Sequence, residues 1–467
     1  MKRVWICLLV AIFVGSLTFM GIGCKEEVAE EAASAEEAAE EAAPAEEEIA
    51  KEPVKLVLWW WGEVETPGLE NFIVDSIDAY EKINPNVEIE QVLQTSENTI
   101  PAFKAAAEAQ GGPDIATIWY GVYQLEEVWA GNVEPIDNYI GPEETDHWLG
   151  KELSTYDGKL WGSDLYGYGS TMMYNKEAFE KADLDPETPP VTWDEFIAAC
   201  EALKAAGIEP WIAGFKTPAW GFSYFASNYW PQKLDSTNEL KVAAIGEEKN
   251  FTEEEFVDMW QRIDQLNKNG YYMEGGASVT YTEATQEWRM GNGAFVITAS
   301  QQALMWYDEL GSEKAGFMAF PSITDKKVDW MPVAPITLFI TKWSPNKEIA
   351  ADFLKFLHTE DRLDAMIKLL EGTCVPPDDR LDMSLVTDPQ KEFLFEQVIG
   401  GFERGTWFTD ALLPYMILGD GVLSAGQKLV TGEIGPEEAG QMVESAAELW
   451  RETSPEAVEK YKKWATE

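Results

Sequence analysis

The chain has 467 residues, with 20 Trp against 16 Tyr, and its 35 Lys or Arg against 83 Asp or Glu give a formal net charge of −48. Proteins that bind phosphate backbones or anionic membrane surfaces supply positive charge, so this balance predicts no nucleic-acid partner. The chain exceeds the roughly 250–300 residues at which a single core usually divides, and this length predicts two lobes.

The first 23 residues have the pattern of an export signal. Lys2 and Arg3 precede an uncharged stretch that continues to Gly23. Such a stretch is typical of a signal peptide or of a membrane anchor. Gly21, Ile22 and Gly23 lie directly before Cys24, which resembles the lipobox of bacterial lipoproteins, although a lipobox usually has Leu where Gly21 stands. We predict a signal peptide over 1–23 and lipid attachment at Cys24, with an uncleaved anchor or cleavage without lipid as alternatives; all three export the protein.

An acidic tether follows the predicted lipid site. Residues 25–52 contain 12 Glu and 2 Lys, and most of the others are Ala. A charged segment without large apolar side chains cannot bury enough surface to offset the entropy of ordering it. We therefore predict that residues 24–52 form the lipid-anchor cysteine and a Glu/Ala tether, separate from the folded body.

Cysteine, histidine and motif content indicate no catalytic or metal chemistry. Cys200 and Cys374 are the cysteines of the body and do not have CxxC spacing, and His147 and His358 stand apart in the sequence. The chain has no HExxH, P-loop, GxSxG or regular EF-hand motif. The sequence therefore predicts no catalytic residue, no metal and no cofactor.

The body begins with alternating strand and helix patterns. Strands are predicted at residues 54–61, 87–92 and 114–119, and helices at 73–85 and 102–110. This order predicts a parallel sheet, in which ligands bind beyond the carboxyl ends of the strands. Residues 59–63 and 119–123 fall at two such ends and are rich in Trp and Tyr, so the aromatic residues gather where a ligand would lie.

Six segments of the chain resemble motifs of one protein family. They are GGPDIATIWYG (111–121), MMYNKEAFEKADLD (172–185), TPPVTWDEFIAACEALKAAGIEP (188–210), MGNGAFVITAS (290–300), SPNKEIAADFLKFL (344–357) and GEIGPEEAGQMV (432–443). Each also works as local helix-cap or turn chemistry; Thr192 and Glu195, for example, form a capping box. In this order, however, the six resemble the extracellular solute-binding proteins of ABC sugar importers, the family that includes maltose-binding protein.

The resemblance implies a fold and its division into lobes. The expected fold class is α/β, the two-lobed periplasmic-binding-protein fold (class II), with three hinge crossovers near residues 166–168, 331–335 and 376–380 and a ligand cleft between the lobes. The N-terminal lobe is then expected at 53–166 plus 333–378. The C-terminal lobe is expected at 167–332 plus 379–467.

The resemblance also places ligand-binding residues, and sugar chemistry explains their types. A pyranose has apolar C–H faces and a hydroxyl equator, so it needs flat rings beside it and planar polar groups around its edge. The expected ligand-binding residues are Trp61, Glu63, Trp119, Tyr120, Tyr168, Trp220, Gln301, Trp330 and Trp407. For each Trp the alternative is packing in the core, and Glu63 could instead be a solvated loop residue.

The function implied is that of the substrate-binding component of an ABC transporter, not an enzyme. It would capture a neutral mono- or oligosaccharide by hinge closure and deliver it to the permease. The protein is expected to be a monomer that its N-terminal lipid holds at the membrane, either in the periplasm or at the cell surface. Phosphorylated ligands need basic residues that the expected site lacks, which favours a neutral ligand. The alternatives are the same fold binding a polyamine or glycerol phosphate, or an exported glycosidase with paired carboxylates.

Overall fold

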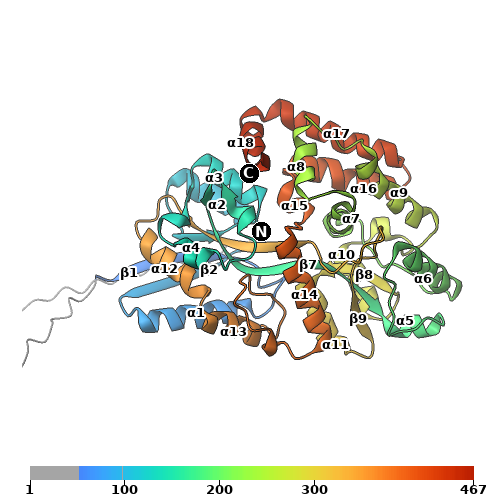
Figure 1. Ribbon diagram of the computed structural model, residues 1–467, viewed down its shortest axis with the longest axis horizontal. Helices are drawn as coiled ribbons and strands as arrows, with labels where there is room; N and C mark the ends of the chain where they lie inside the picture. Colours follow the sequence, from blue (N-terminus) through green and yellow to red (C-terminus); the bar gives the residue numbers. More distant parts are fainter. Residues whose placement is uncertain (1–51, 97, 467) are drawn as a thin grey trace, which may run out of the picture. The chain divides into compact units, whose positions relative to one another are not determined.

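The computed structural model describes residues 52–96 and 98–466 (Figure 1). The predicted signal peptide, Cys24 and nearly all of the predicted tether lie outside the described residues. The described residues belong to one compact unit. Within the described part of the chain, no helix combines the length and the apolar character needed to cross a membrane.

The first three strands form the parallel sheet that their pattern predicts. The elements are β1 (Val54–Trp60), α1 (Leu69–Ile83), β2 (Val87–Leu93), α2 (Thr99–Ala109) and β3 (Ile115–Thr117). Strand β1 pairs in parallel with both β2 and β3. The predicted strands and helices are confirmed, and the carboxyl ends of β1 and β3 lie next to each other.

Two long antiparallel strands extend this sheet. The strand order is β2-β1-β3-β10-β7-β8, with β4 also on β10 and β9 also on β7. The added strands are β4 (Val133–Glu134), β7 (Ser163–Asn175), β8 (Phe295–Ala299), β9 (Ala315–Met318) and β10 (Val333–Thr341). Every residue of β7 and β10 is buried, as expected for strands covered on both faces.

Strand β7 belongs to both halves of the sheet. Its first part, up to Gly169, pairs with β10, whereas Ser170–Tyr174 pair with β8 and Met172–Asn175 pair with β9. Figure 1 shows β7 passing from the part that contains β1 and β2 to the part that contains β8 and β9. The backbone therefore connects the two halves through one continuous strand.

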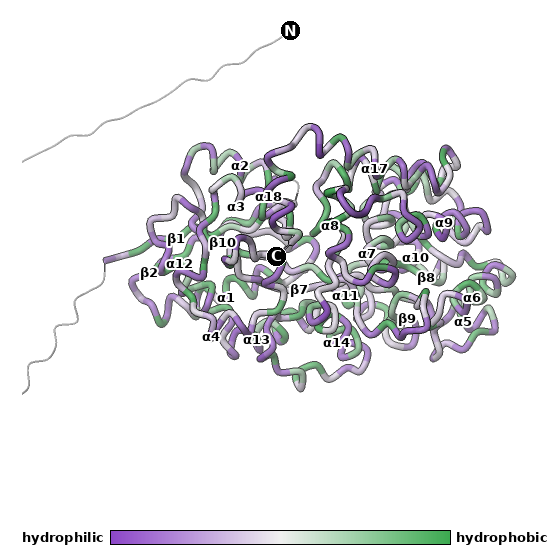
Figure 2. Tube along the Cα trace, turned by 45° about the horizontal axis from the view of Figure 1, so that its top comes forward, coloured by the Kyte–Doolittle hydropathy of each residue, from purple (hydrophilic) through white to green (hydrophobic). Residues whose placement is uncertain are grey.

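Helices cover the sheet with their apolar faces. Buried residues in α1 recur at helical spacing (Leu69, Phe72, Ile73, Ile77 and Tyr80), and hydrophobic and hydrophilic residues alternate along α1 and α17 in Figure 2. The remaining helices are α3 (Val122–Ala130), α4 (Pro142–Thr145), α5 (Lys176–Lys181), α6 (Trp193–Ala205), α7 (Tyr224–Lys233), α8 (Asn238–Ile245), α9 (Glu254–Lys268), α10 (Tyr281–Arg289), α11 (Ser300–Leu310), α12 (Lys347–Leu357), α13 (Glu360–Leu369), α14 (Pro389–Arg404), α15 (Thr409–Leu412), α16 (Ser424–Val430), α17 (Pro436–Thr453) and α18 (Pro455–Thr466). The expected capping box at Thr192 is confirmed.

The three segments predicted as crossovers lie side by side around Gly167. Gly167 of β7 pairs with Pro335 of β10 and forms an isolated bridge with Val375. Its N–H donates to the Val375 carbonyl at 2.8 Å, and the Val375 N–H donates back at 3.1 Å. A Cβ at position 167 would lie 2.5 Å from the ring of Phe402, so glycine allows this close approach.

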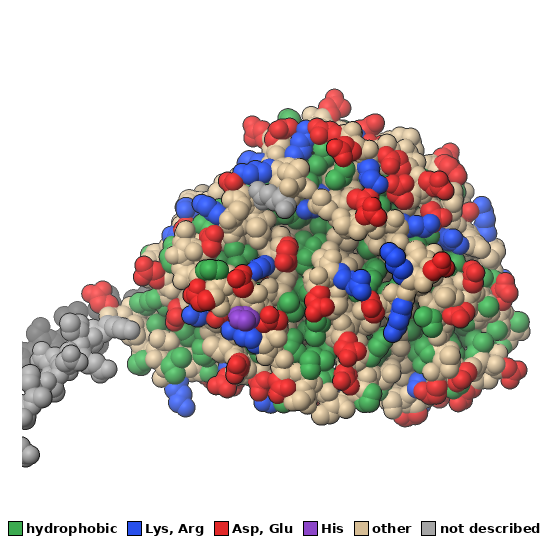
Figure 3. Space-filling model, in the orientation of Figure 1, with side chains coloured by type: hydrophobic (Ala, Val, Ile, Leu, Met, Phe, Trp, Pro, Cys, Tyr) green, Lys and Arg blue, Asp and Glu red, His purple; other side chains and the backbone are tan. Residues whose placement is uncertain are grey.

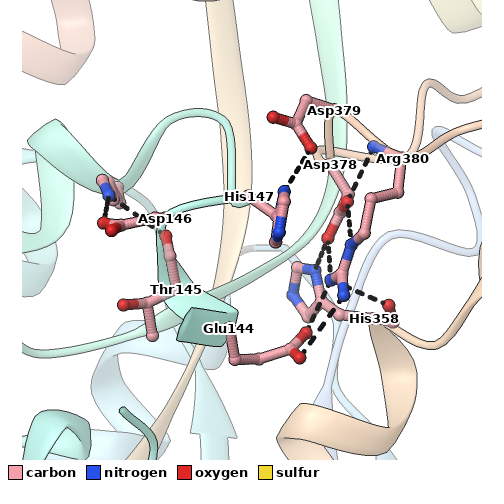
Figure 4. A network of polar contacts seen from close by, with 9 residues as sticks. Glu144, Thr145, Asp146, His147, His358, Asp378, Asp379 and Arg380 are labelled. Atoms are coloured by element: carbon pink, nitrogen blue, oxygen red, sulfur yellow. Dashed lines mark hydrogen bonds and ion pairs between the residues drawn. The ribbon is translucent and has the colours of Figure 1, made fainter. Parts of the chain in front are cut away.

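A buried polar network fixes the third of these segments (Figure 4). His358 receives a hydrogen bond from Ser163 at Nε2 (2.9 Å) and donates from Nδ1 to Asp378 (3.1 Å). Arg380 donates to Asp378 (2.7 Å) and to Glu144 of α4 (2.5 Å). Burial lowers the pKa of His358, and the neutral ring is suited to these two roles. For Asp378, burial alone would raise the pKa, but hydrogen bonds from Arg380 and His358 lower it to about 2.

Asp164 of β7 is another buried carboxylate, and it makes the stability of the fold depend on pH. Asp164 is 4% exposed, accepts a 2.6 Å hydrogen bond from Thr337, and its Oδ2 has no partner among the described residues. Burial raises its pKa from an ordinary 3.8 to about 7. Since the folded-state pKa is the higher one, this group's contribution to stability is present below pH 4 and is lost as pH rises through about 7.

We therefore expect the substitution D164N to remove the loss of stability that the ionisation of Asp164 causes as pH rises. The free energy of unfolding of D164N, relative to the wild type, should rise between pH 4 and pH 8 by up to about 4 kcal/mol. Urea unfolding of both proteins at several pH values measures the difference, with the exposed D420N as the control. Parallel pH profiles for D164N and the wild type would show that Asp164 does not carry this effect.

Candidate ligand-binding site

A cavity of about 410 Å³ lies at the carboxyl ends of β1 and β3. Aromatic residues from distant parts of the sequence make up much of its wall. Its lining is Trp61, Glu65, Ser96, Trp119, Tyr120, Tyr123, Tyr166, Tyr168, Thr217, Pro218, Ala219, Trp220, Ser223, Tyr224, Gln301, Asp410, Tyr415, Leu418 and Leu423. This volume is in the range of small-molecule sites.

The loop after β1 supplies one wall. Trp61 is buried, and its Nε1 donates to the Ile118 carbonyl at 3.2 Å, which joins the ends of β1 and β3. Gly62 has a φ of +118°, and a Cβ there would lie 2.9 Å from the Tyr166 hydroxyl. This turn points Glu65 into the lining, where it accepts a 2.5 Å hydrogen bond from Ser96.

The loop after β3 and the shared strand β7 supply a second wall. Trp119 packs edge-on against Tyr123, with ring centroids 5.3 Å apart and planes at 71°. The hydroxyls of Tyr120 and Tyr168 lie 3.0 Å apart. Tyr168 belongs to β7, so this contact joins the β3 loop to the strand that connects the two halves of the sheet.

Two π-helical segments supply the opposite wall. Ala219–Ser223 precede α7 and Met416–Leu423 precede α16, and both contribute residues to the lining. Trp220, on the first segment, stacks on Tyr281 with centroids 4.3 Å apart and planes at 13°. This support fixes the ring of the half-buried Trp220 in the wall. Widened helical turns of this kind are frequent at functional sites.

Several polar atoms in the lining residues lack protein partners. Trp119 Nε1, Tyr123 Oη, Ser223 Oγ and Gln301 Oε1 are buried without a hydrogen bond among the described residues. A buried polar group without a partner is costly, and each such group in a native protein calls for an explanation. The four include donors and acceptors, so a ligand with hydroxyl groups would satisfy both kinds.

The charge of the wall is entirely negative. Glu65 and Asp410 are the charged residues in the lining formed by the described residues, which contains no Lys, Arg or His. Burial raises the pKa of Asp410 to about 6, against a 3.4 Å hydrogen bond from Tyr120 that lowers it. The site therefore offers hydrogen-bond acceptors and ring faces, and it offers no cation for a phosphate or carboxylate ligand.

The structure brings six of the nine predicted residues to the cavity: Trp61, Trp119, Tyr120, Tyr168, Trp220 and Gln301. Glu63 lies outside the lining because its carboxylate accepts hydrogen bonds from the backbone of Gly68 (3.0 Å) and Glu70 (2.7 Å) and so caps α1. Trp330 is buried beside α14. Trp407 packs edge-on against Phe402, and its backbone bridges to Val333. These two Trp residues occupy the core, which is the alternative their sequence left open.

The sequence reasoning missed several lining residues. Tyr123 lies in the first turn of α3, three residues after Tyr120, and the spacing of this aromatic run could have indicated it. Glu65 lies two residues beyond the predicted Glu63. Asp410 and Tyr415 follow Trp407 in a segment without a recognisable motif, so no local signal marks them.

The described residues contain no group of three or more His, Cys, Asp or Glu side chains placed to hold a metal ion. His147 and His358 instead form single pairs with Asp379 and Asp378. Their surroundings are accounted for by hydrogen bonding within the protein.

Comparisons with known sequences point to one family. Residues 66–361 match the family model described as bacterial extracellular solute-binding protein. An uncharacterized ABC transporter extracellular-binding protein of Pyrococcus horikoshii is 24% identical over 290 residues, which are 62% of this chain and 65% of that protein. An sn-glycerol-3-phosphate-binding periplasmic protein of Brucella abortus is 31% identical over 146 residues, 31% of this chain and 32% of that protein. The chain thus matches less than two thirds of the length of either relative.

Comparisons with solved structures show the fold. A chitin oligosaccharide binding protein matches with a TM-score of 0.69 at 19% identity, over 85% of this chain and 98% of that one. A solute binding protein of Thermotoga lettingae with bound alpha-D-tagatose gives 0.68 at 19%, over 84% and 98%. The cyclic alpha-maltosyl-1,6-maltose binding protein of Arthrobacter globiformis gives 0.68 at 19%, over 85% and 98%. The expected two-lobed α/β fold is confirmed.

Proposed function

The chain belongs to the family of bacterial extracellular solute-binding proteins, and from this premise we propose that it is the solute-binding component of an ABC importer for a mono- or oligosaccharide. The observation that carries the proposal is the cavity, whose lining combines Trp and Tyr rings with residues whose buried polar atoms have no partner among the described residues. A sugar matches both features, because its C–H faces pack on rings and its hydroxyls both donate and accept.

The charge of the site favours this cargo over phosphorylated solutes. Glycerol phosphate is the ligand named for the Brucella relatives, but the alignment covers 32% of that protein. Phosphate is normally held by Arg, Lys or helix N-termini, and the described lining contains two carboxylates and no basic side chain. Structural neighbours that bind oligosaccharides, such as the chitin oligosaccharide binding protein, add support for a sugar.

We propose that ligand is trapped by closure of two lobes, 53–166 plus 333–378 and 167–332 plus 379–467. The partner change of β7 after Gly169 and the adjacency of Gly167, Pro335 and Val375 support three crossovers at the expected positions. The cavity wall draws on both proposed lobes, since Trp119 and Trp220 fall on different sides of this division. A ligand that contacts both walls favours the closed form, and an ABC permease can recognise the change of shape.

The same proposal includes how the protein is held and what it does not do. We propose that the signal peptide is cleaved before Cys24 and that lipid is attached to this cysteine. The acidic segment up to residue 52 would then tether a monomer outside the membrane, within reach of the permease. The chain acts as a binding protein without turnover. The exported glycosidase remains the alternative, with Glu65 and Asp410 as its carboxylates.

A panel of mono- and oligosaccharides tests the proposal by intrinsic fluorescence and thermal shift. Since Trp61, Trp119 and Trp220 line the cavity, a bound sugar should change the emission and raise the melting temperature, by mass action on the native state. Glycerol 3-phosphate and spermidine serve as comparison ligands. A response to either of these without any response to a carbohydrate would contradict the proposal.

A further inference from the structure

The cavity combines a negative wall with an unusual number of aromatic rings. Its described lining holds Glu65 and Asp410, no basic side chain, and nine Trp or Tyr residues. Aromatic faces attract cations, and carboxylates bind them most strongly where water is excluded. This composition suits a ligand with a positive charge better than one without.

Asp410 is the centre of this arrangement. Asp410 lies on α15 and is half-buried. Its carboxylate accepts a long hydrogen bond, 3.4 Å, from the hydroxyl of Tyr120. Unlike Asp378, which Arg380 pairs, Asp410 has no ion-pair partner among the described residues. Backbone N–H groups of Asp410 and Ala411 also lower the pKa of this carboxylate by hydrogen bonding, but none of its partners carries a positive charge, so its negative charge is not compensated within the wall.

Tyrosines from four parts of the chain lie close enough to Asp410 for its charge to raise their pKa values. Tyr120 and Tyr123 face it from the β3 loop and α3, Tyr168 from β7 and Tyr224 from α7. Burial is the largest cause of the raised pKa of both Tyr168 and Tyr224, and the negative charges of Asp410 and Glu65 also raise both pKa values. The two carboxylates therefore act on the same pair of tyrosine hydroxyls, and both line the same cavity.

We propose that the saccharide bound here carries a protonated amino group, held by Asp410 among the tyrosine rings, with Glu65 as the second acceptor. This inference rests on the proposed function and names the class of sugar, an amino sugar with a free amine. An ammonium group supplies the donors and the positive charge that Asp410 lacks, and the surrounding rings present their negative faces to it. A neutral sugar would supply hydroxyl donors and leave the charge uncompensated.

The proposal revises one expectation from the sequence. The sequence favours a neutral ligand because phosphate needs basic residues, and it keeps a polyamine as an alternative because the chain is acidic. An amino saccharide meets both arguments, since its rings use the Trp and Tyr faces and its amine uses the carboxylates. Phosphorylated and acidic sugars stay excluded by the same charge.

Matched pairs of sugars test the proposal by titration calorimetry. Each pair has one member with a free amine and one with a hydroxyl at that position, such as glucosamine and glucose, galactosamine and galactose, and β-1,4-linked oligomers of glucosamine and of glucose; N-acetylated forms remove the charge but keep the nitrogen. At pH 7 the free amine should bind at least about tenfold more tightly than its neutral and acetylated partners, as expected for a charge-assisted hydrogen bond.

Variants assign the preference to Asp410. D410N should weaken binding of the amine about tenfold to hundredfold and bring it to the level of the neutral sugar, and E65Q should have a smaller effect. D420N removes one charge from an exposed residue outside the lining and should change neither affinity. In the wild type the preference should weaken as pH falls through about 6, where Asp410 becomes protonated.

The outcomes separate this inference from the proposed function. If neutral sugars bind as tightly as their amines, or if D410N keeps the preference, the inference is wrong while the sugar-binding function stands. Binding of spermidine without binding of any saccharide would contradict both, and so would the absence of a response to every saccharide. A preference for the amine that D410N abolishes and D420N leaves intact is the expected result.

Discussion

Replacing Arg380 with Met is expected to lower the free energy of unfolding by about 3–5 kcal/mol. Arg380 contacts Asp378 at 2.7 Å and Glu144 at 2.5 Å, and also donates to the His358 carbonyl at 3.1 Å. Asp378 is completely buried, so loss of the guanidinium leaves a carboxylate without its main compensating charge. Chemical unfolding at pH 7 measures the effect.

A matched pair on the surface and a double variant provide the controls. Arg404 pairs with Asp329 at 2.8 Å, and both side chains are about half exposed, so R404M should cost no more than about 1 kcal/mol. D378N combined with R380M should recover part of the loss, because the unpaired charge is removed. Equal effects of R380M and R404M would contradict the role of the buried network.

Replacing Trp119 or Trp220 with Ala is expected to weaken saccharide binding about tenfold to hundredfold while changing stability little. Both rings are half-buried in the cavity wall, and stacked aromatic residues usually dominate the affinity of a site that contains them. Trp220 is held by Tyr281 at 4.3 Å, and Y281A should therefore reproduce part of the W220A effect. Titration calorimetry gives the affinities, and urea unfolding gives the stabilities.

Trp407 is the control for this prediction. It is 7% exposed, lies outside the cavity lining and packs on Phe402. W407A should cost about 3–5 kcal/mol of stability, as is usual for a large buried side chain, and leave affinity unchanged once the variant is folded. If W407A lost affinity while W119A and W220A bound saccharide normally, the cavity lined by Trp119 and Trp220 would not be the saccharide-binding site.

The sequence predicted the fold well where patterns are local. The buried run before Trp61 and the Gly111-Gly112 break after the second helix pattern mark strands and helix ends, and the structure has β1, α2 and β3 there. Parallel pairing follows from their alternation. The ends of β1 and β3 therefore came together as expected, and with them Trp61, Trp119 and Tyr120.

The rest of the site depends on contacts that local patterns do not encode. Glu63 and Glu65 stand two residues apart, and which of them faces the cavity is decided by the cap that Glu63 provides for α1. Tyr120 and Asp410 contact each other across 290 positions of sequence. In the segment that contains Asp410, the sequence predicted Trp407 as the ligand-binding residue, but the ring of Trp407 packs against Phe402.

The net charge of −48 says less about the site than about the surface. Figure 3 shows acidic side chains spread over the visible face, with basic ones among them, and no single large acidic patch. Such a distribution favours solubility and explains why composition predicted the absence of nucleic-acid binding without locating a ligand. The two carboxylates that matter in the cavity, Glu65 and Asp410, are a small part of the total.

Titration calorimetry of the purified protein with saccharides tests the central claim most directly. The proposed function predicts saturable binding at one site per chain, with the saccharide recovered unchanged after the titration. No saturable heat with any carbohydrate, or continuous heat accompanied by cleavage of an oligosaccharide, would contradict a sugar-binding protein without catalysis.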